Sequence, residues 1–258
     1  MPSIDVDQEL MDAAEGGRAE RVLELLAEGA DPQSLESRAL RFAACGGQAE
    51  CVRILLSVSD PKAKESYALR IAAYGGHVEC VRLLLPVSDP RAESSQALRW
   101  AAERGHAGCV RLLLPVSDPR AEDSGALRWA AGNGHAECVR MLLPGSDAKA
   151  AGSAALRWAA KRGHAECVRL LMTASGPLGK IGGLLEQVIE GGSAKVAALL
   201  IAEDPRILDG ADLQKCLASA HEKGHGDMAG LLLSIMDQKE LLAIAPDQTV
   251  RSPALARL

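Results

Sequence analysis

Cysteine and histidine recur along the chain at a fixed spacing, and both residue types can ligate metals or take part in thiol chemistry. One cysteine and one histidine return every 29 residues. The cysteines of this column are Cys51, Cys80, Cys109, Cys138 and Cys167, and the histidines are His77, His106, His135 and His164. A separate pair, His221 and His225, has the i, i+4 spacing that can place two metal ligands on one helical turn.

Geometry argues against a metal or disulfide ladder in these columns. Stacked helices lie about 8–10 Å apart, whereas zinc–nitrogen bonds are about 2 Å and disulfides need Cα atoms within about 7 Å. His221 and His225 lack an obvious third ligand, and Gly224 between them is expected to break the helix. We therefore predict that the cysteines pack in the core, that the histidines cap helices or bond between repeats, and that no metal or cofactor binds.

The chain contains no motif of a common enzyme class. It lacks a P-loop, a dinucleotide-binding fingerprint, a nucleophile elbow and an HExxH sequence. A cysteine-dependent enzyme would need Cys216 beside His221 or His225, with a lowered thiol pKa and access to substrate. We predict that the protein is not an enzyme and retain this pairing as an alternative.

Composition favours a helical protein of a reducing compartment. Hydrophobic residues make up 48% of the 258 residues and aromatic residues only 2%, so small residues and leucine must fill the core. No run of about 20 apolar residues predicts a transmembrane helix, and the acidic N-terminus has no signal-peptide pattern. Seven cysteines without a CxxC pair argue against a disulfide framework. We expect a cytoplasmic protein, or one delivered into a host cell by a non-classical route.

Charge is unevenly distributed. Residues 1–31 hold 9 acids and 2 bases, residues 32–175 hold 14 acids and 19 bases, and residues 176–258 hold 11 acids and 8 bases. The basic middle favours a partner with an acidic surface. Because the bases are interleaved with glutamate, we predict no DNA binding. Weak polyanion binding through arginine columns is a second alternative.

The same 29-residue period runs through most of the chain. Five near-identical repeats share a leucine column and a glycine column. These are Leu40, Leu69, Leu98, Leu127 and Leu156, and Gly47, Gly76, Gly105, Gly134 and Gly163. Degenerate copies around Gly17, Gly192 and Gly224 extend the array to about eight repeats over residues 8–233. Divergent end repeats are what a solenoid needs, because its end faces meet water.

Each repeat is predicted to form two short helices. Leu98, Ala101 and Ala102 share one face of the first helix, and Gly105 ends it. Pro115 ends the second helix. The Asp-Pro pair at 118–119 resembles a helix cap followed by proline at the first helical position, so it predicts the start of the next first helix.

The pattern Ala-Ala-x-x-Gly-His-x-Glu-x-Val-x-Leu-Leu-Leu resembles the ankyrin repeat, and residues 29–31 match the loop of that family. Two features depart from it. Residues 96–99 read Gln-Ala-Leu-Arg instead of Thr-Pro-Leu-His, and the period is 29 rather than about 33. The missing residues fall where the family has a projecting finger, so we expect fingers that are trimmed or replaced by a helical turn. The near-identity of the repeats suggests recent duplication, as in bacterial ankyrin-like proteins.

The resemblance implies an all-α solenoid of stacked helix-turn-helix repeats that binds proteins. We predict an N-terminal capping repeat in residues 1–37 and five regular repeats in residues 38–175. Two degenerate repeats and a cap follow in residues 176–244, with a flexible tail in residues 245–258. Since both ends diverge and carry extra charge, we expect a monomer.

An aromatic column and a variable pair define the predicted binding site. At 100° per residue, the column of Trp100 lies about 130° from the centre of the buried face. Its tryptophans either pack over the next repeat or line the concave face as anchors, and both can hold. The two residues after Ala-Ala vary between repeats and, by resemblance, face the concave surface. The predicted partner-binding residues are Phe42, Ile71, Tyr74, Trp100, Glu103, Arg104, Trp129, Asn133, Trp158, Lys161 and Arg162.

A column of arginines stands beside the aromatic one. It consists of Arg41, Arg70, Arg99, Arg128 and Arg157. Like charges at this spacing repel unless they are paired or screened. Two interpretations remain: a structural ladder with Asp60, Asp89, Asp118 and Asp147, or a basic stripe for an acidic partner. The predicted function is a non-enzymatic scaffold that serves as an effector, an immunity protein or a regulator.

Overall fold

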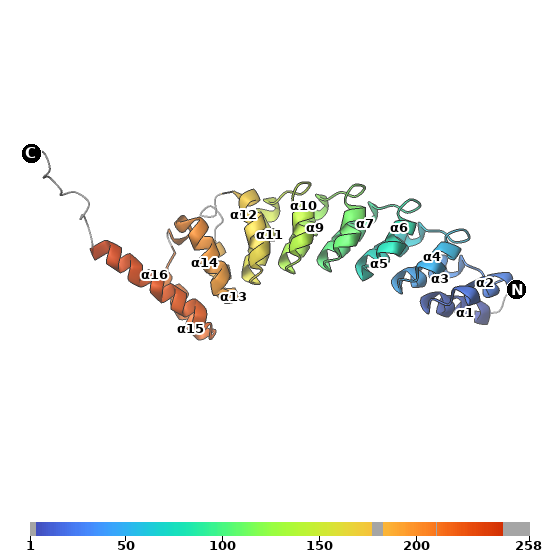
Figure 1. Ribbon diagram of the computed structural model, residues 1–258, viewed down its shortest axis with the longest axis horizontal. Coiled ribbons are helices and arrows are strands. Elements are labelled where there is room, and N and C mark those ends of the chain that lie inside the picture. Colours follow the sequence, from blue (N-terminus) through green and yellow to red (C-terminus); the bar gives the residue numbers. More distant parts are fainter. Residues whose placement is uncertain (1–3, 177–182, 210, 245–258) are drawn as a thin grey trace, which may run out of the picture. The chain divides into compact units, whose positions relative to one another are not determined.

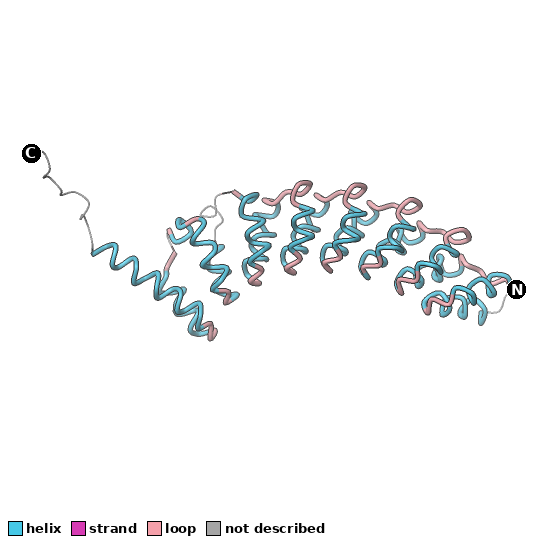
Figure 2. The backbone as a smooth tube through the Cα atoms, in the orientation of Figure 1, coloured by secondary structure: helices cyan, strands magenta, loops and turns pink. Residues whose placement is uncertain are grey.

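The computed structural model describes residues 4–176, 183–209 and 211–244. These residues form sixteen α-helices and one short 3-10 helix, and none of them lies in a strand (Figures 1 and 2). This confirms the predicted all-α solenoid with shortened connections. The predicted flexible tail at 245–258 lies outside the described residues.

The helices follow one another as eight pairs, each pair being one repeat. The first three pairs are α1 (Ile4–Glu15) and α2 (Ala19–Ala27), α3 (Ser34–Cys45) and α4 (Ala49–Leu55), and α5 (Ala63–Gly75) and α6 (Val78–Leu84). The next three are α7 (Ala92–Glu103) and α8 (Ala107–Leu113), α9 (Ala121–Gly132) and α10 (Ala136–Leu142), and α11 (Ala150–Lys161) and α12 (Ala165–Ser175). The last two are α13 (Leu184–Gly191) and α14 (Ala194–Glu203), and α15 (Leu213–Glu222) and α16 (Gly226–Ile244), with the 3-10 helix η2 (Pro205–Leu208) between them.

The described residues divide into two compact units. Those up to Ala159, together with Glu166–Gly176, make the N-terminal unit, and the remainder make the C-terminal unit. Within the N-terminal unit, first helices stack on first helices and second helices on second helices. The longer connections between repeats lie along one edge of this unit, and the short turns inside each pair lie along the opposite edge (Figure 2).

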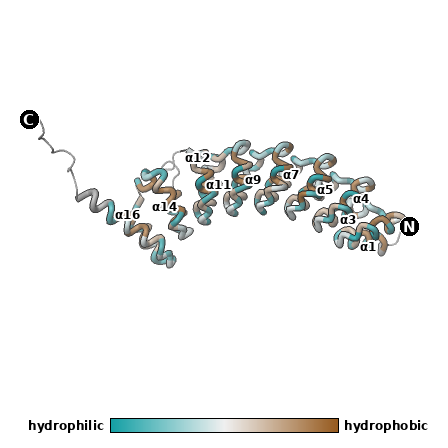
Figure 3. The backbone as a smooth tube through the Cα atoms, viewed as in Figure 1, coloured by the Kyte–Doolittle hydropathy of each residue, from teal (hydrophilic) through white to brown (hydrophobic). Residues whose placement is uncertain are grey.

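Leucine and small residues fill the core of the N-terminal unit. One leucine from each first helix and one from each second helix is fully buried: Leu10, Leu25, Leu40, Leu55, Leu69, Leu84, Leu98, Leu113, Leu127, Leu142, Leu156 and Leu171. The Ala-Ala pairs between them let neighbouring helices approach closely, and hydrophobic and hydrophilic stretches alternate along the helices (Figure 3). The cysteine column is buried as predicted, and burial raises the pKa of Cys109 to about 11, so its thiol stays protonated.

Glycine and histidine connect one repeat to the next. The glycine column has positive φ values from +71° to +81° at the end of each first helix. The predicted inter-repeat role of the histidines is confirmed for three of them. His77, His106 and His135 place Nε2 within 2.9–3.0 Å of a backbone carbonyl oxygen one repeat earlier. Since a carbonyl only accepts, each ring donates from Nε2.

The connection between repeats contains a left-handed turn that the sequence analysis did not predict. In α7, Glu93, Ser94 and Ser95 have φ values of 50°, 56° and 57°, although the hydrogen bonding is helical. The turn is closed by the Ser95 N–H, which donates to the Arg91 carbonyl oxygen at 3.0 Å. Equivalent turns occur at residues 35–37, 64–66, 122–124 and 151–153. The prediction that Asp-Pro starts the first helix is therefore wrong, because a left-handed turn intervenes.

Buried serines hold these turns against the next repeat. The Oγ atoms of Ser37, Ser66, Ser95 and Ser124 accept from the backbone N–H of Asp60, Asp89, Asp118 and Asp147 at 2.8–2.9 Å. Each of these serines is only 1% exposed. The aspartate carboxylates instead accept from the backbone N–H two residues further on, at 2.8–2.9 Å.

The arginine column also binds the left-handed turns. Nη2 of Arg41, Arg70, Arg99 and Arg128 donates to the first carbonyl of the turn at 2.6–2.8 Å. No ion pair joins these arginines to the junction aspartates in the described part of the chain. The predicted arginine–aspartate ladder is therefore wrong. The guanidinium groups instead donate charge-assisted hydrogen bonds to backbone carbonyl oxygens of the left-handed turns.

Replacing Ser94 by glycine tests the left-handed turn. The change Ser94→Gly is expected to stabilise the protein by about 0.5–1 kcal/mol, because glycine removes left-handed strain at the expense of some unfolded-state entropy. In a right-handed helix the same change would destabilise the protein by about 0.5 kcal/mol, because glycine has the lower helix propensity. Urea denaturation measures the sign. The fifth turn already has glycine at this position, Gly152 with φ +66°, so Gly152→Ser should show the opposite effect.

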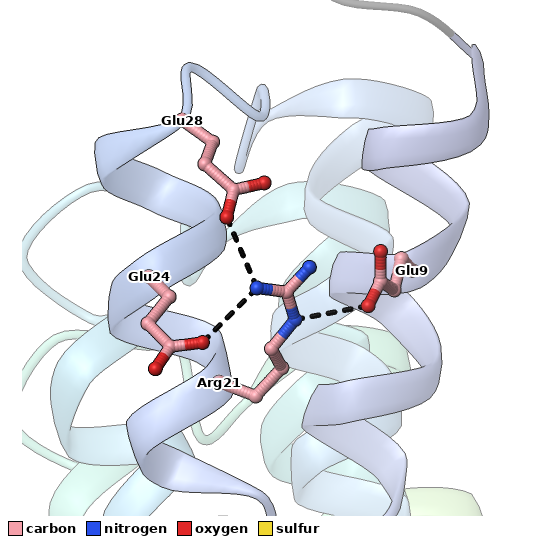
Figure 4. A network of polar contacts seen from close by, with 4 residues as sticks. All are labelled: Glu9, Arg21, Glu24 and Glu28. Carbon is pink, nitrogen blue, oxygen red and sulfur yellow. Dashed lines mark hydrogen bonds and ion pairs between the residues drawn. The ribbon is translucent and has the colours of Figure 1, made fainter.

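An ion-pair network closes the N-terminal repeat (Figure 4). Arg21 on α2 bonds Glu9 on α1 at 2.9 Å and also Glu24 and Glu28 at 3.0 Å each. The hydrogen bond from Arg21 lowers the pKa of the Glu9 carboxyl. A single arginine therefore screens three carboxylates in the strongly acidic first repeat.

Candidate functional site

The aromatic column lies on the face formed by the first helices, which we call the first-helix face. Phe42, Ile71, Trp100, Trp129 and Trp158 are all half-buried. Trp129 and Trp158 contact each other edge to face, with ring centroids 5.2 Å apart. Trp100 contacts Tyr74 in the same manner at 5.5 Å. Each indole is therefore packed on one side against a neighbour and accessible on another.

The variable pair adds polar groups along this face. The Arg104 guanidinium is exposed, lies 4.2 Å from the centroid of the Tyr74 ring and donates to the Tyr74 hydroxyl. The Asn133 side chain donates to the Glu103 carbonyl oxygen at 2.9 Å. Lys161 and Arg162 are exposed. Arg104 and Trp100 both meet Tyr74, so the structure brings these three predicted residues together.

The arginine column lies behind this surface. Arg41, Arg99, Arg128 and Arg157 are half-buried, and Arg70 is only 8% exposed. Because most of these guanidinium groups donate to the left-handed turns, the column is mainly structural, and a continuous basic stripe stays a prediction. Arg41 differs, since it also lines an open hollow.

A second variable column, which was not among the predicted site residues, also lies on the first-helix face. It lies four residues before the aromatic column and consists of Arg38, Tyr67, Gln96, Gly125 and Ala154. The i, i+4 relation places the two columns side by side, and the Arg38 guanidinium lies 5.0 Å from the Phe42 ring centroid. The signal was present in the sequence, because this position varies within otherwise near-identical repeats.

A hollow of about 570 Å³ opens between α3 and α5. Residues of the aromatic column and of the second variable column line this hollow together. Its lining is Leu35, Glu36, Arg38, Arg41, Phe42, Cys45, Lys64, Tyr67 and Ile71. The hollow therefore combines apolar walls with four charged side chains, those of Glu36, Arg38, Arg41 and Lys64.

Burial of His106 makes stability depend on pH. Burial is the largest cause that lowers the pKa of His106, and the nearby positive charge of Arg104 lowers it further. The hydrogen bond to the Tyr74 carbonyl raises the pKa but does not offset these two causes. The unfolded chain then binds more protons below about pH 6.5, so this contribution to stability is present above that pH and is lost as pH falls. We expect the fall in unfolding free energy from pH 7 to 5 to be shallower in His106→Gln. Gln48 occupies the same position naturally and donates to the Glu15 carbonyl at 3.2 Å. Urea titrations across this range measure the slope, and an unchanged slope contradicts the assignment.

The thiol alternative gains no support from the geometry. Cys216 is 6% exposed, and burial raises the pKa of its thiol, whereas a nucleophilic cysteine needs a lowered pKa. Nε2 of His225 lies 3.3 Å from the Glu190 carbonyl. Among the described residues, no group of three or more acidic, histidine or cysteine side chains is arranged to hold a metal ion. No described helix has the length and apolar content needed to cross a membrane.

Comparison with known proteins identifies the family. A family model described as ankyrin repeats (3 copies) matches residues 10–94, 57–123 and 98–179. The crystal structure of the human ASB11 ankyrin repeat domain is similar, with a TM-score of 0.57 and 25% sequence identity over 66% of this chain and 85% of that one. No curated protein matches the chain. The protein belongs to the ankyrin repeat family. Ankyrin repeats are generally protein–protein interaction modules and typically non-enzymatic.

Proposed function

We propose that the chain is a non-enzymatic scaffold that binds a partner protein on its first-helix face. The observation that carries the proposal is the row of half-buried aromatic side chains at Phe42, Trp100, Trp129 and Trp158. Amphipathic aromatic groups with one packed side lose little side-chain entropy on binding, and tryptophan is enriched among residues that dominate interface energies.

Variation between the repeats supports the same surface. The buried leucine, alanine and cysteine positions hardly change from repeat to repeat, because stacking fixes them. Several of the positions that do change, such as Tyr74 and Glu103, lie on the first-helix face. Packing does not dictate these residues, so we assign them to partner selection. A partner inside the cell would make the protein an effector, an immunity protein or a regulator.

Affinity capture tests the proposal. The wild-type chain and the variant Trp100→Ala, Trp129→Ala, Trp158→Ala serve as baits in lysate from the source cells, with captured proteins quantified by mass spectrometry. We expect the recovery of a specific partner to fall by about tenfold or more in the variant, since hot-spot tryptophans contribute roughly 2 kcal/mol or more each. Circular dichroism checks that the helices remain.

Two further variants separate the face from the fold. Arg104→Glu changes an exposed side chain of the first-helix face without touching the core and should also reduce capture. The matched control carries Arg53→Ala, Arg82→Ala and Arg111→Ala, three exposed arginines of the second helices, and should retain the partner. A partner kept by the tryptophan variant and lost by the control would place binding on the second helices instead.

A further inference from the structure

The hollow between α3 and α5 has apolar walls. Phe42 on α3 and Ile71 on α5 belong to the aromatic column, and Tyr67 stands one turn before Ile71. The hollow opens to solvent beside the exposed Leu35, which is 56% exposed in the first left-handed turn. An apolar side chain entering here would contact aromatic and aliphatic groups that are otherwise partly hydrated.

The hollow exists because of the residues in the aromatic column. Position 71 holds isoleucine, whereas the same position in the next three repeats holds Trp100, Trp129 and Trp158. In those repeats the indoles reach neighbouring rings, as the 5.2 Å contact between Trp129 and Trp158 shows. The smaller Ile71 leaves the corresponding space beside Phe42 unfilled.

Two cations at the hollow lack an acidic partner. Lys64 pairs with Glu36 at 2.7 Å, so these two charges offset each other. In the described part of the chain, no carboxylate lies within ion-pair distance of Arg38 or Arg41. Burial, together with the nearby charge of Arg38, lowers the pKa of Arg41, which indicates that an anion placed between them would relieve repulsion.

The two arginines are held in position for such an anion. Nε and Nη2 of Arg41 donate to the Glu36 and Leu35 carbonyl oxygens at 3.2 and 2.7 Å, and its guanidinium lies 5.9 Å from the Tyr67 ring centroid. Arg38 is positioned by the Phe42 ring. Pre-organised guanidinium groups lose less entropy when they bind a carboxylate than free side chains do.

We propose that the hollow between α3 and α5 binds an acidic peptide segment of the partner protein, with a large apolar side chain against Phe42 and Ile71 and flanking carboxylates on Arg38 and Arg41. This deepens the proposed function by locating the partner contact and giving its chemistry. A nucleic acid fits less well, because Lys64 is neutralised by Glu36 and the remaining cations form no extended track.

Binding of a defined probe tests the proposal. The probe is an acetylated heptapeptide, Glu-Asp-Glu-Phe-Glu-Asp-Glu, titrated to millimolar concentration into ¹⁵N-labelled full-length protein at low salt. We expect saturable amide shifts around Arg38, Phe42 and Ile71 that weaken as salt is raised. A probe with alanine in place of phenylalanine, and one with amides in place of the carboxylates, should each bind several-fold more weakly.

Three variants link this binding to the hollow. Arg38→Gln removes one exposed cation and should weaken binding by about fivefold. Ile71→Trp places in the hollow the side chain that the next three repeats carry, and should weaken binding by about tenfold or more while leaving both arginines intact. The matched control, Arg53→Gln, removes an exposed arginine from α4 and should bind like wild type.

The outcomes separate this inference from the proposed function. Absence of shifts at millimolar probe, equal binding of the alanine probe, or equal or tighter binding of single-stranded oligonucleotide overturns the acidic-peptide assignment. If affinity capture still identifies a partner that depends on the tryptophans, the scaffold function stands and only the hollow is wrongly assigned. The assignment is supported if probe binding weakens on loss of the phenylalanine, on loss of the carboxylates, in Arg38→Gln and in Ile71→Trp.

Discussion

Replacement of Gly105 by alanine is expected to destabilise the protein by about 2–3 kcal/mol. Gly105 has φ +76°, and a Cβ atom there would lie 2.5 Å from Nδ1 of His135. A left-handed non-glycine residue carries about 1–2 kcal/mol of strain. Moving the imidazole away also breaks the 2.9 Å contact between His135 Nε2 and the Glu103 carbonyl, which contributes about 1 kcal/mol more.

A double variant and a matched glycine separate these two causes. In a His135→Ala background, Gly105→Ala should cost only the backbone strain, about 1–2 kcal/mol. Gly29→Ala should cost a similar amount in the wild-type chain, because Gly29 has φ +96° and a Cβ atom added there would meet no other atom within 4 Å. Urea denaturation gives the unfolding free energies. Equal losses for Gly105→Ala in both backgrounds would show that the histidine ring does not restrict this position.

Replacement of Ser95 by alanine is the second large effect that we expect, a loss of about 1–3 kcal/mol. The Ser95 Oγ is buried and accepts from the Asp118 N–H at 2.9 Å, joining one repeat to the next. Alanine has similar backbone preferences, so the change mainly leaves this N–H, the donor of a partly buried hydrogen bond, without its acceptor, and an unmet donor of this kind costs about that amount. Hydrogen exchange should also show faster exchange of the Asp118 amide.

Ser94 is the matched control for this change. It is the preceding residue of the same left-handed turn, with φ 56°, but its side chain is exposed. Ser94→Ala should change stability by less than about 0.5 kcal/mol. If the two alanine variants lose the same free energy, the inter-repeat bond to Ser95 is not what holds the junction.

Local residue patterns predicted most of the fold. The 29-residue recurrence of Leu98, the Ala-Ala pair, Gly105 and Cys109 predicted helix pairs that stack, and each of these positions has the predicted burial or conformation. These predictions succeed because every regular repeat packs against near-identical neighbours. A residue type that recurs at the same position of each repeat is therefore buried at the same place in each repeat. The first-helix face was predicted in part, through the aromatic column and the variable pair.

The sequence alone thus determined which leucine, alanine and cysteine positions are buried, where glycine ends the first helix of each repeat, and the resemblance to the ankyrin repeat. Only the tertiary structure decided the left-handed turns, the carbonyl ligands of the arginine column and the hollow beside Ile71. A left-handed turn of non-glycine residues opposes local propensity, and it persists because Ser95 and Arg99 bond it in the stacked array. The hollow depends on how side chains of two adjacent repeats, such as Phe42 and Ile71, pack against each other. The residue pattern within a single repeat does not determine this packing.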